Sequence, residues 1–510
     1  MINNILRRPP WRSSALCVAA GLALSACAVG PDFHEPEAPK VADASHPYTP
    51  APLPAMAASG ASPAYVPQHF VNAQDISATW WEAFQSPALN ALVQSALTHS
   101  PTATAAQATL RQAEENYRAE YGSRVFPSVT GQLSAGRTRY AVAQGAGIPA
   151  GSTGNLFQAG LDLSYTLDIV GGNRRELESV RAAIDYQRFQ VEATWLSLTS
   201  SVVATAIQEA SLRAQLQATR EVVENANQSL KVINAQVRLG ALARGALLQQ
   251  QTLIAQQQAQ IPPLEKALAQ TRHQLAVLAG RLPGDEGLPT FDIDSLTLPR
   301  ELPISVPAAL VRQRPDVRAS EALLHEASAQ IGVATAALYP QITLSGGVNR
   351  ESFKIDKLFD TGTTGWSLAA GLVQPIFNGG ALRARKQAAV AAYDAAQAQY
   401  QSTVLNAFLG VANALRAIDT DAEAVTANAE AERLANEALG LVQRQYQLGA
   451  VSYLASLDAQ RTALNTRVSL VQARAARLTD TAALFQALGG GWWNAPDAVA
   501  SAASASAAAH

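Results

Sequence analysis

The sequence has little of what thiol, metal or phosphate chemistry requires. Two of its 510 residues are Cys, at positions 17 and 27. Two Met argue against a copper or silver relay built from thioethers, and the seven His show no metal-binding spacing. Phosphate-loop, zinc-protease and serine-hydrolase motifs are absent. We therefore expect no catalytic residue, no metal site and no cofactor.

Charge and long apolar runs are also scarce. Charged residues make up 15% of the chain and the net charge is −2. The chain therefore lacks the excess of positive charge that is typical of nucleic-acid-binding proteins. Beyond the amino-terminal leader no unbroken apolar run reaches the roughly eighteen residues that a membrane-spanning helix needs. A polytopic helical membrane protein is thereby excluded.

The first residues have the form of an export signal. Arg7, Arg8 and Arg12 precede a short apolar stretch that ends in Leu24-Ser25-Ala26-Cys27. Small residues before a Cys resemble a bacterial lipobox, which predicts cleavage after residue 26 and lipidation of Cys27. A plain signal peptide is the alternative. With lipidation, the mature chain keeps no free thiol, and Ala28 after the Cys implies sorting to the outer membrane.

Two segments have compositions that do not favour a core of their own. Residues 27–75 are rich in Pro and Ala and predict an extended strap. Residues 494–510 are mostly Ala and Ser and predict a disordered tail.

The rest of the chain contains an internal sequence repeat. Four stretches of the first half match four stretches of the second half in the same order, each displaced by about 210 residues. Chance similarity between Ala-rich helices could produce one such match but not four in register. We expect two repeats, at residues 76–290 and 291–493.

Each repeat predicts the same order of elements. Gly171-Gly172 and Gly379-Gly380 mark the changes from strand to helix. A helix of about 65 residues measures on the order of 100 Å, which no ordinary globular core has. The expected elements are medium helices (88–122, 315–338), paired strands (128–140 and 157–169, 341–350 and 366–377), long helices (173–238, 381–447) and returning helices (242–280, 452–488).

All four strands alternate between apolar and polar side chains. From Phe157 to Ile169 the alternation has no exception, over a length that would span a bilayer. A sheet in lipid must leave no open edge, and four strands cannot close a barrel with a lumen, so several copies must close one together. Two, three or four copies fit the pattern equally. A soluble sandwich face, or an extended coiled coil that ignores the strands, is the alternative.

Several motifs place these features in a family. The sequences "RQRPDVRASEALLHEASAQIGVATAALYPQITL", "QPIFNGG", "YQLGAVSYLASLDAQR" and "QALGGGWW" resemble the TolC-like outer-membrane efflux proteins, and more closely their lipoprotein (OprM-like, NodT-type) branch. The resemblance implies an α+β membrane protein: a homotrimer whose twelve-stranded outer-membrane β-barrel, four strands per chain, continues into a periplasmic α-helical barrel. It also implies a passive exit duct for an RND-type tripartite pump, with outer-membrane lipid, a periplasmic adaptor and an inner-membrane RND transporter as partners.

The two helix-hairpin tips are the expected functional site. Gly240 and Gly449 follow the long helices and predict left-handed helix stops. The resemblance implies a periplasmic gate at Tyr446, Leu454 and Asp458, and an adaptor contact at Arg238, Leu239, Gly240, Gln447, Leu448 and Gly449. The first hairpin departs from this pattern. At the positions of the first repeat that correspond to Leu454 and Asp458, the sequence has Gly245 and Gln249. A merely solvated carboxylate is the alternative role for Asp458.

Other functions remain open at this stage. A duct for type I protein secretion would share the fold. A structural lipoprotein without a pore would explain the helices but not the strands. An anchored periplasmic enzyme would need a cluster of catalytic groups that the sequence lacks.

Overall fold

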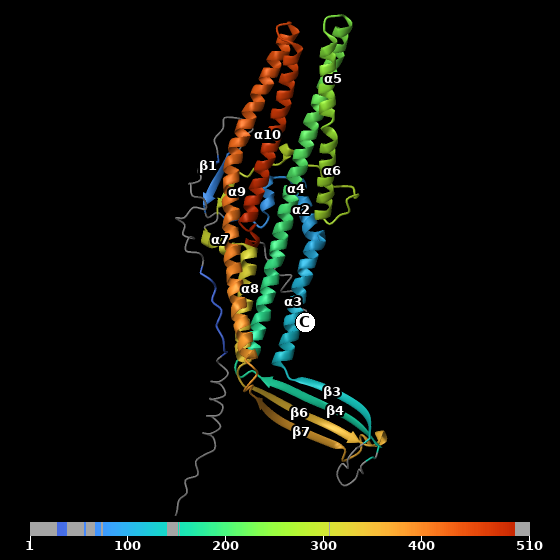
Figure 1. The fold of residues 1–510 in the computed structure, drawn as a ribbon, viewed down its shortest axis with the longest axis vertical. Coiled ribbons are helices and arrows are strands. Elements are labelled where there is room, and N and C mark those ends of the chain that lie inside the picture. The colour runs from blue at the N-terminus through green and yellow to red at the C-terminus, as the bar shows by residue number, and fades with distance from the viewer. Residues whose placement is uncertain are drawn as a thin grey trace, which may run out of the picture. The chain divides into compact units, whose positions relative to one another are not determined.

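The computed structural model describes residues 28–37, 56–57, 67–72, 75–139, 151, 153–304 and 307–494. The predicted signal peptide, the lipidation site Cys27 and residues 495–510 lie outside the described residues. Figure 1 labels the main elements. In chain order they are β1 (Met56–Ala57), β2 (Gln68–Asn72), η1 (Trp80–Phe84), α2 (Pro87–His99), α3 (Pro101–Val125), β3 (Ser128–Arg139), β4 (Thr153–Leu167), α4 (Gly172–Arg238), α5 (Arg244–Gln258), α6 (Ile261–Leu278), η3 (Ile293–Ser295), β5 (Glu301–Ile304), α7 (Pro307–Gln313), α8 (Pro315–Ala336), β6 (Gln341–Ser352), η4 (Ile355–Lys357), β7 (Thr364–Val373), α9 (Ala381–Gln447), α10 (Tyr453–Ala487) and η5 (Trp492–Asn494).

The chain forms two compact units. The strand unit comprises the described residues of 1–36, 109–187 and 320–400. The hairpin unit comprises those of 37–108, 188–319 and 401–510. Each unit therefore combines segments from both repeats.

The strand unit contains one antiparallel sheet in the order β3-β4-β6-β7 (Figure 1). Strands β4 and β6 pair from Phe157 opposite Ser352 to Leu167 opposite Ile342, and this ladder joins the two repeats. Strands β3 and β7 are the outer strands of the sheet.

One feature of this sheet is unusual for a folded chain: its large apolar side chains are exposed. Leu133 is 80% exposed and Trp366 is 79% exposed. The other large exposed apolar side chains on the same face of the sheet are Val129, Leu161, Leu163, Val348, Leu368 and Leu372, while Val373 lies on the opposite face. An apolar sheet face of this extent needs a lipid or protein partner.

The strands follow the predicted positions with shifted ends. Strand β4 begins at Thr153, before the predicted start at residue 157, and ends at Leu167. Strand β7 ends at Val373 rather than 377, because Pro375 cannot donate to a ladder and also restricts Gln374.

The two long helices are confirmed almost to the residue. Helices α4 and α9 each contain 67 residues, which corresponds to a length on the order of 100 Å. Gly171 (φ +80°) precedes α4, while Gly379 (φ +63°) and Gly380 (φ +84°) precede α9. Among the described helices, none combines the length and the apolar character needed to cross a membrane.

Two helices that the sequence predicts as single are each divided. The predicted helix 88–122 is α2 and α3, because Ser100 precedes Pro101 and is extended (φ −67°, ψ 124°). The predicted helix 242–280 is α5 and α6, with a break at Ala259-Gln260. Proline in the first turn of α6 explains this second break, since it cannot donate to the preceding turn.

The core of the hairpin unit is built from both repeats. Trp80 stacks on Phe485 with ring centroids 5.5 Å apart. Fully buried side chains of the same cluster include Phe84, Leu89, Ile207, Leu415 and Leu484. Helices α4 and α9 thus bury small and branched residues against α2 and α10.

The predicted strap contains a strand that the sequence did not reveal. Strand β2 pairs in parallel with β5, from His69 opposite Glu301 to Asn72 opposite Ile304. The fully buried Gln68 accepts a hydrogen bond from Arg477 Nε (3.0 Å) and donates to Thr481 Oγ1 (3.3 Å) of α10. Gln68–Asn72 therefore attach the strap to β5 and α10 of the hairpin unit, a contact that the sequence did not predict.

Candidate functional site: the two hairpin tips

Both hairpins turn in the same way. Gly240 (φ +76°) follows α4 and Gly449 (φ +72°) follows α9, so the two left-handed helix stops are confirmed. Ala241 N–H donates to the Gln236 carbonyl (2.8 Å) and Ala450 N–H to the Gln445 carbonyl (2.9 Å). These are the long hydrogen bonds of Schellman motifs, which satisfy carbonyls that the helix ends would leave open.

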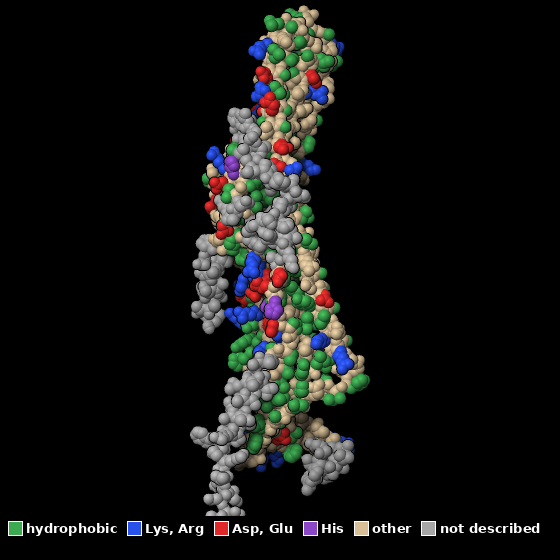
Figure 2. Space-filling view, turned by 90° about the vertical axis from the view of Figure 1, so that its left-hand side faces the viewer, with side chains coloured by type: hydrophobic (Ala, Val, Ile, Leu, Met, Phe, Trp, Pro, Cys, Tyr) green, Lys and Arg blue, Asp and Glu red, His purple; other side chains and the backbone are tan. Residues whose placement is uncertain are grey.

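The tips present exposed leucines. Leu239 is 84% exposed and Leu448 is 85% exposed. Arg238, Gly240, Gln447 and Gly449 beside them are exposed as well. Figure 2 shows mainly hydrophobic and neutral side chains at this end of the hairpin unit, with few charges. The six predicted adaptor-contact residues therefore form two small exposed surfaces, each with one leucine, one glycine and one charged or polar side chain.

A buried polar link joins the two hairpins behind their tips. Tyr453, the first residue of α10, donates its hydroxyl hydrogen bond to Gln250 Oε1 of α5. The Gln250 side chain is fully buried and donates from Nε2 to the Ala226 carbonyl of α4 (2.6 Å). One glutamine thus connects the first hairpin internally and to the second hairpin.

Tyr446 belongs to the same region. Its hydroxyl donates to Gln236 Oε1 of α4 (3.2 Å), and its ring lies 5.5 Å from that of Tyr453. Burial raises the pKa of both tyrosines, so both hydroxyls remain protonated donors. Around them pack Ile233, Val237, Leu242, Leu253 and Leu457.

We predict that Tyr453→Phe loosens the hairpin contact, because buried Gln250 Oε1 loses its hydroxyl donor at a cost of about 1–3 kcal/mol. Tyr446→Phe is the matched control, since its partner Gln236 is only half-buried and water can replace the lost bond. Amide hydrogen exchange over the first turns of α5 and α10 measures the effect. Equal loss of protection in both variants would contradict this ranking.

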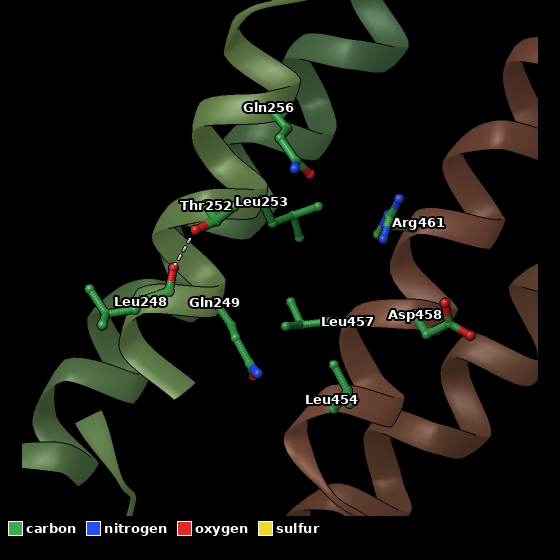
Figure 3. Close-up of a pocket in the computed structure, with 9 residues that line it drawn as sticks. All are labelled: Leu248, Gln249, Thr252, Leu253, Gln256, Leu454, Leu457, Asp458 and Arg461. Carbon is green, nitrogen blue, oxygen red and sulfur yellow. Dashed lines mark hydrogen bonds between the residues drawn. The ribbon is translucent and has the colours of Figure 1, made fainter. Parts of the chain in front are cut away.

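A cavity of about 320 Å³ lies between α5 and α10. Leu248, Gln249, Thr252, Leu253 and Gln256 line it from α5, and Leu454, Leu457, Asp458 and Arg461 from α10. In Figure 3, Leu253, Leu454 and Leu457 point into the space between the two helices. The cavity therefore combines four leucines with two glutamines, one threonine, one carboxylate and one guanidinium.

The predicted gate residues divide between two places. Leu454 (59% exposed) and Asp458 line this cavity together, with Gln249 on the facing helix. Tyr446 is not among the cavity-lining residues and instead joins the tyrosine cluster. Sequence reasoning missed Arg461, Tyr453 and Gln250. Arg461 follows Asp458 by one helical turn and could have been found from that spacing.

The strand–helix junction before α4 has a capping carboxylate. Asp168 accepts hydrogen bonds from the backbone N–H groups of Asn173 and Arg174, both at 3.0 Å. A carboxylate at a helix amino terminus satisfies free N–H groups and complements the helix dipole. The polar residue that follows strand β4 thus caps the start of helix α4.

The hairpin unit also contains a pair of acidic side chains. Burial raises the pKa of Asp421 to about 7, with further contributions from a hydrogen bond to Asp480 and from its charge, while Arg477 acts in the opposite direction. Because the folded state holds this proton more tightly than the unfolded state, this group's contribution to stability is lost as pH rises from about 4 to about 7.

We therefore expect the heat-unfolding midpoint to fall between pH 5 and pH 8, and to fall less in Asp421→Asn. Asp294→Asn, in which an exposed carboxylate paired with Arg474 is altered, is the control and should keep the wild-type difference. Circular dichroism at the two pH values measures the midpoints. An unchanged pH difference in Asp421→Asn would contradict the assignment.

Within the described ranges, no group of three or more His, Cys, Asp or Glu side chains could hold a metal ion. The site consists of helix tips, a cavity lined by leucines together with polar and oppositely charged side chains, and a tyrosine cluster. Such an arrangement can narrow or widen a passage and bind a partner's helices.

Known outer-membrane efflux proteins and channels resemble this chain in sequence and in fold. The family model of the outer membrane efflux proteins matches residues 92–281 and 306–490. The pyoverdine export outer membrane protein OpmQ of Pseudomonas aeruginosa is 34% identical over 452 residues, which cover 87% of this chain and 94% of that protein. The solvent efflux pump outer membrane protein SrpC of Pseudomonas putida is 31% identical over 418 residues, 81% of this chain and 87% of that protein. The solved structure of the outer-membrane channel OprN has a TM-score of 0.79 at 27% identity and covers 91% of this chain and all of that one.

Proposed function

Because the chain belongs to the outer membrane efflux protein family, we propose that it works as follows: three copies close one duct through which a tripartite RND-type pump passes small molecules out of the cell. The protein is the outer-membrane component of that pump. Membership in a family of outer-membrane efflux channels gives it a transport role, and the duct itself moves cargo passively.

The observation that carries the trimeric barrel is the exposed apolar face of the four-stranded sheet. Such a face is compatible with a lipid environment. The outer edges of β3 and β7 are not, because each unpaired backbone group costs several kcal/mol in hydrocarbon. Pairing β7 of one copy with β3 of the next removes every edge. Three copies then give twelve strands, enough to enclose a lumen.

The long helices supply the second part of the duct. Helices α4 and α9 each begin at a strand–helix junction and end at a hairpin tip, so each copy contributes two helices on the order of 100 Å long to a helical barrel. Their apolar side chains Leu405 (67% exposed) and Leu409 (55% exposed) would pack against neighbouring copies.

The hairpin tips would meet the rest of the pump. Leu239 and Leu448, with the exposed residues beside them, offer apolar helix-tip surfaces for a periplasmic adaptor, which in turn links the duct to an inner-membrane RND transporter. The names of the relatives SrpC and OpmQ refer to solvent efflux and pyoverdine export. These names favour efflux of small molecules over type I protein secretion as the function of this chain.

The gate would form where the tips converge around the threefold axis. Leu454 would contribute an apolar ring and Asp458 a ring of one carboxylate per copy, while Tyr446 and Tyr453 hold the two hairpins of each copy together. Opening would then require the hairpins to move apart.

The amino-terminal segments complete the proposed organisation. Residues 1–26 would be removed as a signal peptide, Cys27 would be lipidated in the outer membrane, and residues 27–75 would run as a strap that includes strand β2. The repeats would span 76–290 and 291–493, with 494–510 as a tail.

The two charged side chains that line the cavity, Asp458 and Arg461, allow the proposed gate to be tested. In planar bilayers with a salt gradient, we expect Asp458→Ala to lower the cation-to-anion permeability ratio by at least about twofold, because three carboxylates leave the aperture. Arg461→Ala removes the opposite charge from the same cavity and should raise the ratio. Pores with unchanged selectivity in both variants would move the gate elsewhere but leave the duct in place.

A further inference from the structure

The residues directly after Cys27 lie against the rest of the strand unit. Val29 N–H donates to the Val170 carbonyl at 2.9 Å. A Cβ atom added at Gly171 would come within 2.6 Å of Ala28 Cα. The start of this segment therefore contacts the turn between β4 and α4, and only glycine leaves room for it there.

A second contact brings two backbones together. A Cβ atom added at Gly30, whose φ is +99°, would lie 2.5 Å from Gly332 Cα of α8. Such an approach, together with the positive φ, requires a residue without a side chain at position 30. Gly332 also leaves room for Arg175, whose Cγ would lie 2.7 Å from an added Cβ.

Arg175 of α4 is the centre of the contact, with a side chain only 5% exposed. Its Nε donates to the Val29 carbonyl (3.3 Å), Nη2 to Asp32 Oδ1 (2.6 Å) and Nη1 to Glu178 Oε2 (2.8 Å). The Asp32 side chain is 82% exposed, so water screens that ion pair. The partly buried bond to Val29 and the glycine contacts must therefore carry most of the specificity.

An aromatic contact continues the same surface. Phe33 stacks on His325 of α8, with ring centroids 4.3 Å apart and planes 12° from parallel. His325 Nε2 lies 2.9 Å from Glu178 Oε1, and Glu178 in turn pairs with Arg175. The segment Ala28–Phe33, helix α4 and helix α8 are thus joined by one connected set of contacts.

We propose that Arg175, Glu178, His325 and Gly332 form a docking site for the chain's own segment Ala28–Phe33, and that this site, rather than the lipid, holds the amino terminus at the strand–helix junction. The residue before Ala28 is about 3.8 Å away along the chain. Docking of Ala28 would therefore keep an acyl chain on the preceding residue close to the turn between β4 and α4. This last consequence rests on the proposed lipidation of Cys27.

The test separates the docking site from the lipid. The chain is exported behind a cleavable non-lipoprotein leader with Cys27→Ser, and a nitroxide is attached through His34→Cys. We expect an immobilised spectrum in this unlipidated parent. Arg175→Ala and Gly30→Val should each convert most of the signal to a mobile spectrum. Gly30→Val changes only the segment, so the body of the protein keeps all its residues. Glu37→Gln, at an exposed position beyond the segment, is the matched control and should match the parent.

Two results would overturn the proposal. A mobile label in the unlipidated parent would show that docking needs the lipid. An immobilised label in both Arg175→Ala and Gly30→Val would show that the named contacts do not hold the segment. Single-channel recording on the same preparations tests the duct independently, so failure of the docking site and failure of the channel function are distinguishable.

Discussion

Leu133→Arg is expected to remove nearly all heat-stable trimer from the outer membrane. Leu133 lies in the middle of β3 and its side chain is 80% exposed on the apolar face. An Arg facing lipid near the bilayer midplane costs about 2–4 kcal/mol, and a trimer would carry that cost three times. Membrane fractionation followed by electrophoresis of unheated samples measures the remaining trimer.

Gln132→Arg is the matched control for Leu133→Arg. It adds the same side chain one residue earlier on the same strand, but on the opposite face, which would line the lumen. We expect this variant to assemble and to pass less cation. Loss of trimer in Gln132→Arg would contradict the assignment of this face to the lumen. Normal assembly of Leu133→Arg would contradict the assignment of the other face to lipid.

Glu209→Ala is expected to lower the stability of the hairpin unit more than any surface change in the same helix. The Glu209 carboxylate is fully buried and accepts hydrogen bonds from Arg213, from Arg272 (3.0 Å) and from the backbone N–H of Phe291 (3.0 Å). Its removal leaves two guanidinium groups and a buried N–H without this acceptor. The arginines are about one-third exposed, so we expect the lower end of the roughly 3–5 kcal/mol measured for broken buried pairs.

Glu221→Ala is the control for this effect. Glu221 is also on α4 and also pairs with an arginine of another helix, Arg467 (2.7 Å), but both side chains are more than 40% exposed. Its loss should cost about 0–1 kcal/mol. Heat unfolding of the purified trimers measures both values. Similar shifts for the two variants would contradict the distinction between buried and exposed pairs.

Local signals in the sequence were sufficient for the strands, the long helices and the hairpin turns. Gly240 and Gly449 adopt the left-handed conformation that few other residues tolerate, and a 67-residue amphipathic run between glycines has no competing structure. The break before α6 could have been found too, since Pro262-Pro263 stands inside the predicted helix.

Non-local contacts could not be predicted. Strand β2 has five residues, and its parallel partner β5 lies more than two hundred residues later in the chain. The same limitation hid the link from Tyr453 to Gln250 and the docking of Ala28–Phe33 on Arg175. In each case the residue types are ordinary, and only the fold brings them together.

The central claim is that this chain forms a pore, and single-channel recording of the purified wild-type protein in planar bilayers tests it most directly. The account predicts discrete, uniform conductance steps that depend on trimeric protein and favour cations. The absence of such steps, from protein shown to be folded and trimeric, would contradict the channel and leave a structural lipoprotein as the better description.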